Sequence, residues 1–281
     1  MFLLKTLLLR FPMCYRRPAV MRFRLFRWSI FALLILASPF SFAQQTQTSV
    51  DSPFAIPASD EGLPGSGPIR RYDWFKNLWQ QKRSGWAEQV TRDKQAVVFL
   101  GDSITQGWGD DFGGQFTGMK TANRGISGDT TRGMLIRLQE DVLSLEPSGV
   151  VLLMGTNDLE EGASPETIAG NFKLIVAKLK EYDDKMPIIV CQVFPSSESK
   201  RRPAEQIQSI NRLYSRAVQD DPQITLLDTY SLFANENGDA KPEEFPDLLH
   251  PNAAGYKKWG EAIRPLFASL GFLETEAAGA K

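Results

Sequence analysis

Short apolar runs alternate along the middle of the chain with longer segments in which apolar residues recur about every 3.6 positions. Four of the five short runs are almost continuously apolar and rich in Val, Ile and Leu, which is typical of strands covered on both faces. The longer segments have the spacing of amphipathic helices, and one begins at Ser164-Pro165 with an N-cap serine and a first-turn proline. We predict strands at 96–100, 121–126, 149–154, 187–194 and 223–227, and helices at 131–145, 165–182, 203–220 and 252–270.

This alternation of strands and helices predicts a parallel sheet with helices on both faces. Ligands bind to such sheets beyond the carboxyl ends of the strands. The residues that directly follow the predicted strands are therefore the candidates for a functional site.

Polar residues or glycine lie at the carboxyl ends of four of the predicted strands. Separately, each has an ordinary explanation, because Asp and Ser cap helices and Asn is common in turns. Together they would meet at one edge of the sheet, which makes separate explanations less attractive. The residues are Asp102 and Ser103 after the first strand, Gly125 at the end of the second, Asn157 after the third, and Asp247 and His250 after the fifth.

His250 is the only histidine in the 281 residues, and it lies three positions after Asp247. An imidazole takes up and returns a proton near neutral pH, so His250 is the candidate base for proton-transfer chemistry. A single histidine also disfavours a hydrolytic zinc site, which generally needs several His or Cys ligands. A lone histidine often has only a structural role, but the polar strand ends beside this one favour catalysis.

A serine esterase mechanism would use all of these residue types. A serine hydroxyl needs a base to remove its proton as it attacks, and the base needs a third group to hold its tautomer. Ser103 would be the nucleophile, His250 the base and Asp247 the orienting carboxylate. The developing oxyanion would be bound by the backbone N–H groups of Ser103 and Gly125 and by the amide of Asn157. Gly125 suits this role because it has no side chain to block a close approach.

Four sequence blocks resemble those of the SGNH/GDSL hydrolase superfamily, in order and with suitable spacing, over about residues 72–270. They most resemble the branch with the platelet-activating-factor acetylhydrolase catalytic subunits and bacterial acetylesterases, although Ser127 stands where that branch commonly has glycine. The resemblance implies a flavodoxin-like three-layer α/β/α sandwich with a mainly parallel five-stranded sheet, the same triad and oxyanion hole, and no cofactor. The blocks are Gly101-Asp102-Ser103-Ile104-Thr105, Asn123-Arg124-Gly125-Ile126-Ser127-Gly128-Asp129, Gly155-Thr156-Asn157-Asp158 and Asp247-Leu248-Leu249-His250-Pro251-Asn252.

Other chemistries lack their motifs. The chain contains no Gly-x-Ser-x-Gly nucleophile elbow and no Walker A motif. Aromatic residues lie just beyond the proposed nucleophile, and we expect Trp108 and Phe112 to line an acyl or sugar pocket, with core packing as the alternative. The pair Arg201-Arg202 predicts a solvated turn.

The N-terminal stretch has the pattern of a secretory signal peptide over residues 1–43, with Met21 as an alternative start. Its removal takes away seven basic residues and no acidic ones, so that 32 Lys and Arg against 33 Asp and Glu become 25 against 33, a net charge of −8. The mature chain would therefore lack the basic footprint of a nucleic-acid-binding protein. It would also keep only Cys191 of the two cysteines, so no intramolecular disulfide could form.

The rest of the chain divides by composition into a linker, a domain and a tail. Residues 44–70 are polar and rich in Ser, Pro and Gly and predict a flexible linker, and 273–281 predict a disordered tail. The hydrolase domain would span 71–272. We expect a secreted or periplasmic protein with no stable membrane span in the mature chain, or a membrane-anchored one if the signal is not cleaved.

We therefore predict a serine esterase that removes a small acyl group, with acetyl favoured, through an acyl-enzyme intermediate. An O-acetylated carbohydrate is the favoured substrate because an exported enzyme meets such esters. The alternatives are a lipid-type acetylhydrolase or lysophospholipase, an acyltransferase on the same fold, and an inactive carbohydrate-binding module. The natural ester and the oligomeric state stay open.

Overall fold

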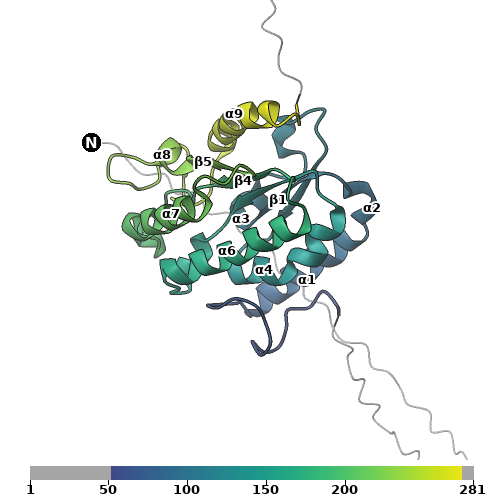
Figure 1. Cartoon of the computed structure of the whole chain (residues 1–281). Coiled ribbons are helices and arrows are strands. Elements are labelled where there is room, and N and C mark those ends of the chain that lie inside the picture. Colours follow the sequence, from purple (N-terminus) through teal and green to yellow (C-terminus); the bar gives the residue numbers. More distant parts are fainter. Residues whose placement is uncertain (1–51, 274–281) are drawn as a thin grey trace, which may run out of the picture. The chain divides into compact units, whose positions relative to one another are not determined.

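Five parallel strands form one sheet in the computed structural model, which describes residues 52–273 (Figure 1). The strand order is β2-β1-β3-β4-β5, so the chain changes direction across the sheet between β1 and β3. Such a switch point is where open α/β sheets bind their ligands. The predicted fold class is confirmed. The strands are β1 Val97–Gly101, β2 Thr121–Gly125, β3 Gly149–Leu153, β4 Ile188–Cys191 and β5 Ile224–Leu227.

The strands beside the switch point end at the same level. Gly101 at the end of β1 pairs with Gly125 of β2 on one side and with Leu153 of β3 on the other. Every residue of β1 and β3 is buried, which explains their continuous apolar sequence. The loops that leave these three strands therefore start side by side.

Helices cover both faces of the sheet (Figure 1). One core layer joins the sheet to α4, α6 and α7, and the other joins it to α8 and α9. The predicted helices agree with the structure to within a few residues, except that 131–145 breaks into α4 and a 3-10 turn at Leu143–Leu145. The helices are α1 Asp73–Ala87, α2 Val90–Asp93, α3 Ser103–Gly107, α4 Thr131–Asp141, α5 Thr156–Glu160, α6 Pro165–Tyr182, α7 Ala204–Val218, α8 Thr229–Phe233 and α9 Ala253–Ser269.

The segment 52–70, which we call the N-terminal strap, differs from the predicted flexible linker. Arg132 on α4 donates to the backbone carbonyl oxygens of Pro64 and Gly67 at 3.2 and 2.9 Å. Asn171 on α6 donates to Ser66 O at 2.8 Å and accepts from Ser66 N at 3.0 Å. A segment without a hydrophobic period is thus held through its backbone by side chains of the domain.

Other predictions about the ends of the chain lie outside the described residues. These are the signal peptide at 1–43, the remaining linker residues before 52, and the tail beyond 273. Among the helices of residues 52–273, none is long and apolar enough to cross a membrane.

Candidate active site

Three predicted residues form one chain of hydrogen bonds at the carboxyl edge of the sheet. His250 Nε2 lies 2.9 Å from Ser103 Oγ, and His250 Nδ1 lies 2.8 Å from Asp247 Oδ2. Ser103 opens α3 directly after β1, whereas Asp247 and His250 belong to the loop between α8 and α9. The fold therefore joins residues that are 147 positions apart into the geometry of nucleophile, base and orienting acid.

A tight turn explains the spacing of three between Asp247 and His250. Asp247 Oδ1 accepts hydrogen bonds from the backbone N–H groups of Leu249 and His250 at 3.1 and 2.8 Å. Leu248 closes the turn with a φ of +61°. Partial burial opposes ionisation of Asp247, but hydrogen bonds from the backbone N–H and ring of His250 lower its pKa to about 2. The carboxylate is thus charged and aimed at Nδ1 over the whole neutral range.

Asp102 fixes the start of α3 and with it the position of Ser103. Asp102 Oδ1 accepts from Ile104 N at 2.9 Å, as an N-cap residue does. The side chain is fully buried, and its Oδ2 has no hydrogen-bond partner among the described residues. Burial raises the pKa of Asp102 to about 6.

The structure corrects the expected role of Gly125. Its N–H donates to Asn123 Oδ1 at 2.9 Å and is therefore not free for an oxyanion. A Cβ added here would lie 2.3 Å from Gln106 N and 2.8 Å from Asp102 O. Position 125 thus needs glycine because α3 packs closely against the end of β2.

Gly128, three residues later, is the alternative glycine in the same sequence block. It lines the same cavity as Ser103, and its φ of +87° is in the left-handed region that favours glycine. A Cβ here would lie 2.7 Å from the Trp74 indole and 2.9 Å from Arg70 Nη1. Within the described part of the chain, neither the Gly128 N–H nor the Ser103 N–H has a hydrogen-bond acceptor.

Asn157 is held in a single orientation by its neighbours. Its Nδ2 donates to Asp129 O at 3.0 Å, and its Oδ1 accepts from Arg202 Nη2 at 3.0 Å. These partners fix which side-chain atom is nitrogen and which is oxygen, since a guanidinium cannot accept and a carbonyl cannot donate. One amide hydrogen is left over, and Asn157 lines the cavity with Ser103.

A fully buried arginine ties the strand ends to the loop that carries Gly128. Arg137 Nη2 donates to Gly101 O at 3.2 Å and to Arg124 O at 2.8 Å, and its Nε donates to Asp129 Oδ2 at 2.7 Å. Burial raises the pKa of Asp129 to about 7, while the Arg137 charge favours the ionised form. The end of β1, the end of β2 and the loop after β2 are thereby held together.

These residues face a cavity of about 450 Å³. Its lining is mostly polar or charged, and it includes residues of the N-terminal strap and of α1 that the sequence does not connect with the site. Arg202 is 2% exposed, so the predicted solvated turn at Arg201-Arg202 is wrong for its second residue. The lining residues are Arg70, Trp74, Ser103, Ser127, Gly128, Asn157, Glu160, Ser199, Lys200, Arg201, Arg202, Asp247, Leu249 and His250.

Trp108 and Phe112 lie in the core and do not line this cavity, contrary to our expectation of a pocket. They are 4% and 0% exposed. Their rings pack against each other with centroids 5.4 Å apart, and Trp108 stacks on Trp259 of α9 at 4.2 Å. Burial of these large rings stabilises the layer under α9, which explains why aromatic residues follow Ser103.

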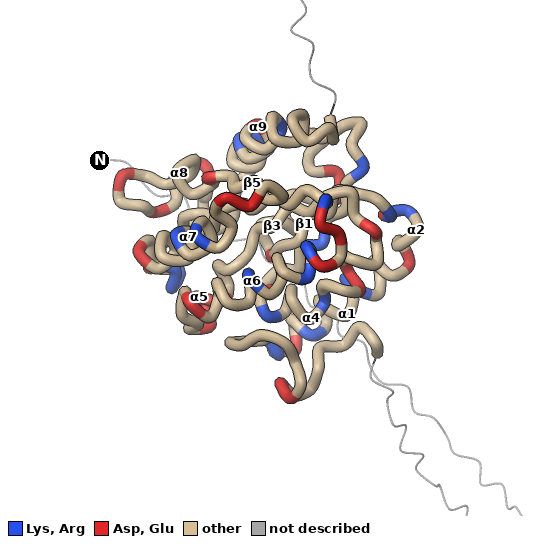
Figure 2. Tube along the Cα trace, viewed as in Figure 1, with Lys and Arg blue, Asp and Glu red and all other residues tan. Residues whose placement is uncertain are grey.

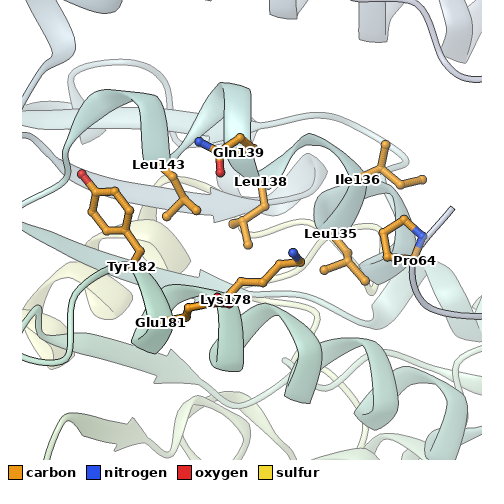
Figure 3. Close-up of a pocket in the computed structure, with 9 residues that line it drawn as sticks. All are labelled: Pro64, Leu135, Ile136, Leu138, Gln139, Leu143, Lys178, Glu181 and Tyr182. Carbon is orange, nitrogen blue, oxygen red and sulfur yellow. The ribbon is translucent and has the colours of Figure 1, made fainter.

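A second cavity of about 380 Å³ lies between α4 and α6 (Figure 3). Leu135 and Leu138 of α4 face Lys178 and Tyr182 of α6, and Pro64 of the strap closes one end. None of the polar strand-end residues lines it. Over residues 52–273, no group of three or more His, Cys, Asp or Glu side chains could hold a metal ion.

The parallel sheet and the polar site at its carboxyl edge define a hydrolase of the α/β/α class. Residues 99–258 match the GDSL-like lipase/acylhydrolase family. The chain belongs to this family and is an ester hydrolase.

Known proteins similar to this chain agree with that assignment. The human platelet-activating factor acetylhydrolase IB subunit alpha2 is 27% identical over 226 residues, which cover 78% of this chain and 92% of the relative. A GDSL-like lipase from Bacteroides thetaiotaomicron is 27% identical in sequence, with a TM-score of 0.59 over 66% of this chain and 97% of that one. An acetyl-xylooligosaccharide esterase variant from Geobacillus has the same fold, with 20% identity, a TM-score of 0.53, and coverage of 65% and 97%.

Proposed function

We propose that Ser103, His250 and Asp247 are the catalytic triad of an esterase that removes a small acyl group, with acetyl favoured. The continuous hydrogen-bond chain from Ser103 Oγ through the imidazole to Asp247 is the observation that carries this proposal. Ser103 Oγ attacks the acyl carbonyl while its proton moves to His250 Nε2. The imidazolium then protonates the leaving alcohol, and water hydrolyses the acyl-enzyme by the same proton path.

The oxyanion of each tetrahedral intermediate would be bound by three donors. They are the backbone N–H groups of Ser103 and Gly128 and the remaining amide hydrogen of Asn157. All three residues line one cavity, and the two backbone donors have no other acceptor within residues 52–273. Such preorganised donors stabilise charge that develops only in the transition state.

A small acyl group suits the lining of the cavity. Trp74 and Leu249 are its only large apolar side chains within the described residues, and the aromatic residues that follow Ser103 are packed in the core. A long acyl chain would need an extended apolar surface, because it gains its affinity from burial of its methylene groups. The name of the human relative, an acetylhydrolase, also supports acetyl.

An exposed aromatic pair, of which one member lines the cavity, supports a carbohydrate as the alcohol part of the ester. Tyr72 and Trp74 are 53% and 52% exposed, and their rings stack with centroids 6.4 Å apart. Trp74 also lines the cavity beside Gly128. A flat, exposed aromatic face offers contact area to a sugar ring at little cost in side-chain entropy. Export through the predicted signal peptide would bring the enzyme to such substrates, in the periplasm or outside the cell.

Hydrolysis of p-nitrophenyl acetate tests the proposal. We expect Ser103→Ala to lower kcat at least a thousandfold, and the matched control Ser199→Ala, another serine of the same cavity, to keep nearly full activity. Equal activity of wild type and Ser103→Ala would exclude Ser103 as the nucleophile. A panel of acetylated oligosaccharides and of esters with longer acyl chains would then test the acyl and alcohol preferences, and an added alcohol acceptor would reveal acyl transfer.

A further inference from the structure

One carboxylate in the cavity is shared by three arginines. Glu160 at the end of α5 pairs with Arg70 of the strap, with Arg202 at 2.8 Å and with Arg201 at 3.3 Å. Arg70 has a second carboxylate partner in Glu161 at 2.7 Å. On this wall of the cavity, two carboxylates therefore face three guanidinium groups.

Lys200 adds a further positive charge to the same wall. It lines the cavity and is half-buried, and no carboxylate of residues 52–273 lies within 4 Å of its Nζ. Arg70, Lys200, Arg201 and Arg202 thus face two carboxylates, which leaves an excess of two positive charges. Basic and acidic residues are interspersed over the rest of the domain (Figure 2), so this excess is a local feature.

The backbone at Arg201 is also unusual. Arg201 has a φ of +58° and a ψ of +33°, in the left-handed region where glycine or asparagine is usual. Its side chain is 69% exposed and lines the cavity, while the next residue, Arg202, is buried. Strain of this kind in a non-glycine residue is frequent at ligand-binding sites.

We infer that the alcohol part of the substrate carries a negative charge, which Lys200 and Arg201 bind. This inference rests on the proposed function, since it describes the leaving alcohol of that reaction. The residues on the wall have two distinct roles. Arg202 is buried and holds Asn157, whereas Lys200 and Arg201 line the cavity, where the cations of the wall outnumber its carboxylates. Together with the exposed Trp74 face, they fit a sugar ring that bears a carboxylate, as in an acetylated acidic oligosaccharide.

The charge of the wall also disfavours a cationic group on the alcohol. A quaternary ammonium would meet an excess of positive charge in the cavity, where partly desolvated charges interact more strongly than in water. Asp247 also lines the cavity and is ionised, so it lowers the excess in the cavity as a whole from two positive charges to one. A free anionic group on the alcohol would instead meet two cations.

Two acetyl esters of the same coumarin, one anionic and one neutral, test the inference. The anionic substrate is 7-acetoxycoumarin-4-acetate, and the neutral one is its N-methylamide, in which a methylene group separates the altered charge from the leaving group. We expect wild type to prefer the anionic ester about tenfold in kcat/KM at low salt and less at 0.5 M NaCl. The preference should lie in KM, since the charge contacts the substrate away from the reacting carbonyl.

Lys200→Ala/Arg201→Gly should reduce this preference to about one. Glycine is chosen at 201 because it accepts the left-handed backbone, so the double variant loses both charges without added strain. The control Lys185→Ala removes an exposed charge just before β4, at the amino edge of the sheet, and should keep the wild-type ratio. An unchanged ratio in the double variant would overturn the inference. Full activity of Ser103→Ala on both esters would instead overturn the proposed function.

Competition experiments distinguish an acidic sugar from another anion. Glucuronate, glucose and glycerol 3-phosphate are compared as inhibitors of neutral-ester hydrolysis. We expect glucuronate to inhibit at about one-tenth the concentration of glucose, and this advantage should disappear in the double variant. Inhibition by glucuronate no stronger than by glucose would contradict the inference, and stronger inhibition by glycerol 3-phosphate than by glucuronate would contradict the choice of a sugar.

Discussion

Replacing Glu160 by glutamine keeps the shape of the side chain and removes the charge that three arginines share. Partial burial alone would raise the pKa of Glu160, but hydrogen bonds and charge from Arg70 and Arg202 lower it from 4.5 to about 2. The folded state therefore binds the ionised form more tightly than the unfolded chain does. The resulting stability is complete above pH 4.5 and is lost as the pH falls toward 2.

The size of the effect follows from this difference in pKa. A pKa of about 2 in place of 4.5 corresponds to about 3.4 kcal/mol at neutral pH. Because 29% of the Glu160 side chain is exposed, solvent screens the pairs, and we expect about 1–2 kcal/mol for Glu160→Gln. At pH 3.5 at least about two-fifths of that difference should be gone, since the wild-type side chain is then mostly neutral in the unfolded chain.

Urea denaturation at pH 7, 5 and 3.5 measures this difference in the free energy of unfolding. Glu236→Gln serves as the control, because Glu236 is exposed and has no ion pair within residues 52–273. It should leave stability unchanged within about 0.5 kcal/mol. Equal stability of wild type and Glu160→Gln at pH 7, or a difference that does not shrink at pH 3.5, would refute the reasoning.

Two further variants test the positions around Ser103. Asn157→Ala should lower kcat for p-nitrophenyl acetate by about a hundredfold to a thousandfold with little change in KM, because it removes a donor used in the transition state; an unchanged kcat would remove Asn157 from the oxyanion hole. Gly125→Ala should destabilise the fold by about 2 kcal/mol or more in urea denaturation, because its Cβ would lie 2.3 Å from Gln106 N. Gly170→Ala is its control, since a Cβ there meets nothing within 4 Å and should stabilise α6 by about 0.5–1 kcal/mol; equal stability of both variants would contradict the packing account.

The sheet and most helices follow from the sequence because their causes are local. Continuous apolar runs predict the buried strands, and the serine and proline at 164–165 predict the start of α6 at the residue where the structure has it. The strand-end rule then predicts that Ser103, Asn157, Asp247 and His250 lie near one another. For these residues, the order of strands and loops along the chain is sufficient to predict that they meet.

The remaining parts of the site depend on contacts that local sequence does not encode. Arg70 meets Glu160 across 90 positions, through a strap that has no hydrophobic period. Arg202 is buried because Thr156 and Glu160 surround its guanidinium, although an Arg-Arg pair is typical of a surface turn. These residues carry no spacing signal that points to the cavity.

Gly125 and Gly128 show where a motif is ambiguous. Both glycines belong to one block, and the sequence does not say which one is needed for its backbone conformation and which for close packing. The structure separates them, since Gly128 has a positive φ and faces the cavity while Gly125 donates to Asn123. The sequence does offer one signal for the second role, because a second glycine, Gly128, stands three positions beyond Gly125 and next to Ser127.

The central claim is that His250 activates Ser103 as the nucleophile, and active-site labelling tests it most directly. Diisopropyl fluorophosphate phosphorylates an activated serine as the serine oxygen displaces fluoride and the base takes up its proton. We predict one adduct per chain, located by peptide mass spectrometry on Ser103, and labelling at least about a hundredfold slower in His250→Ala. An adduct on another residue, or an unchanged labelling rate in His250→Ala, would contradict the account.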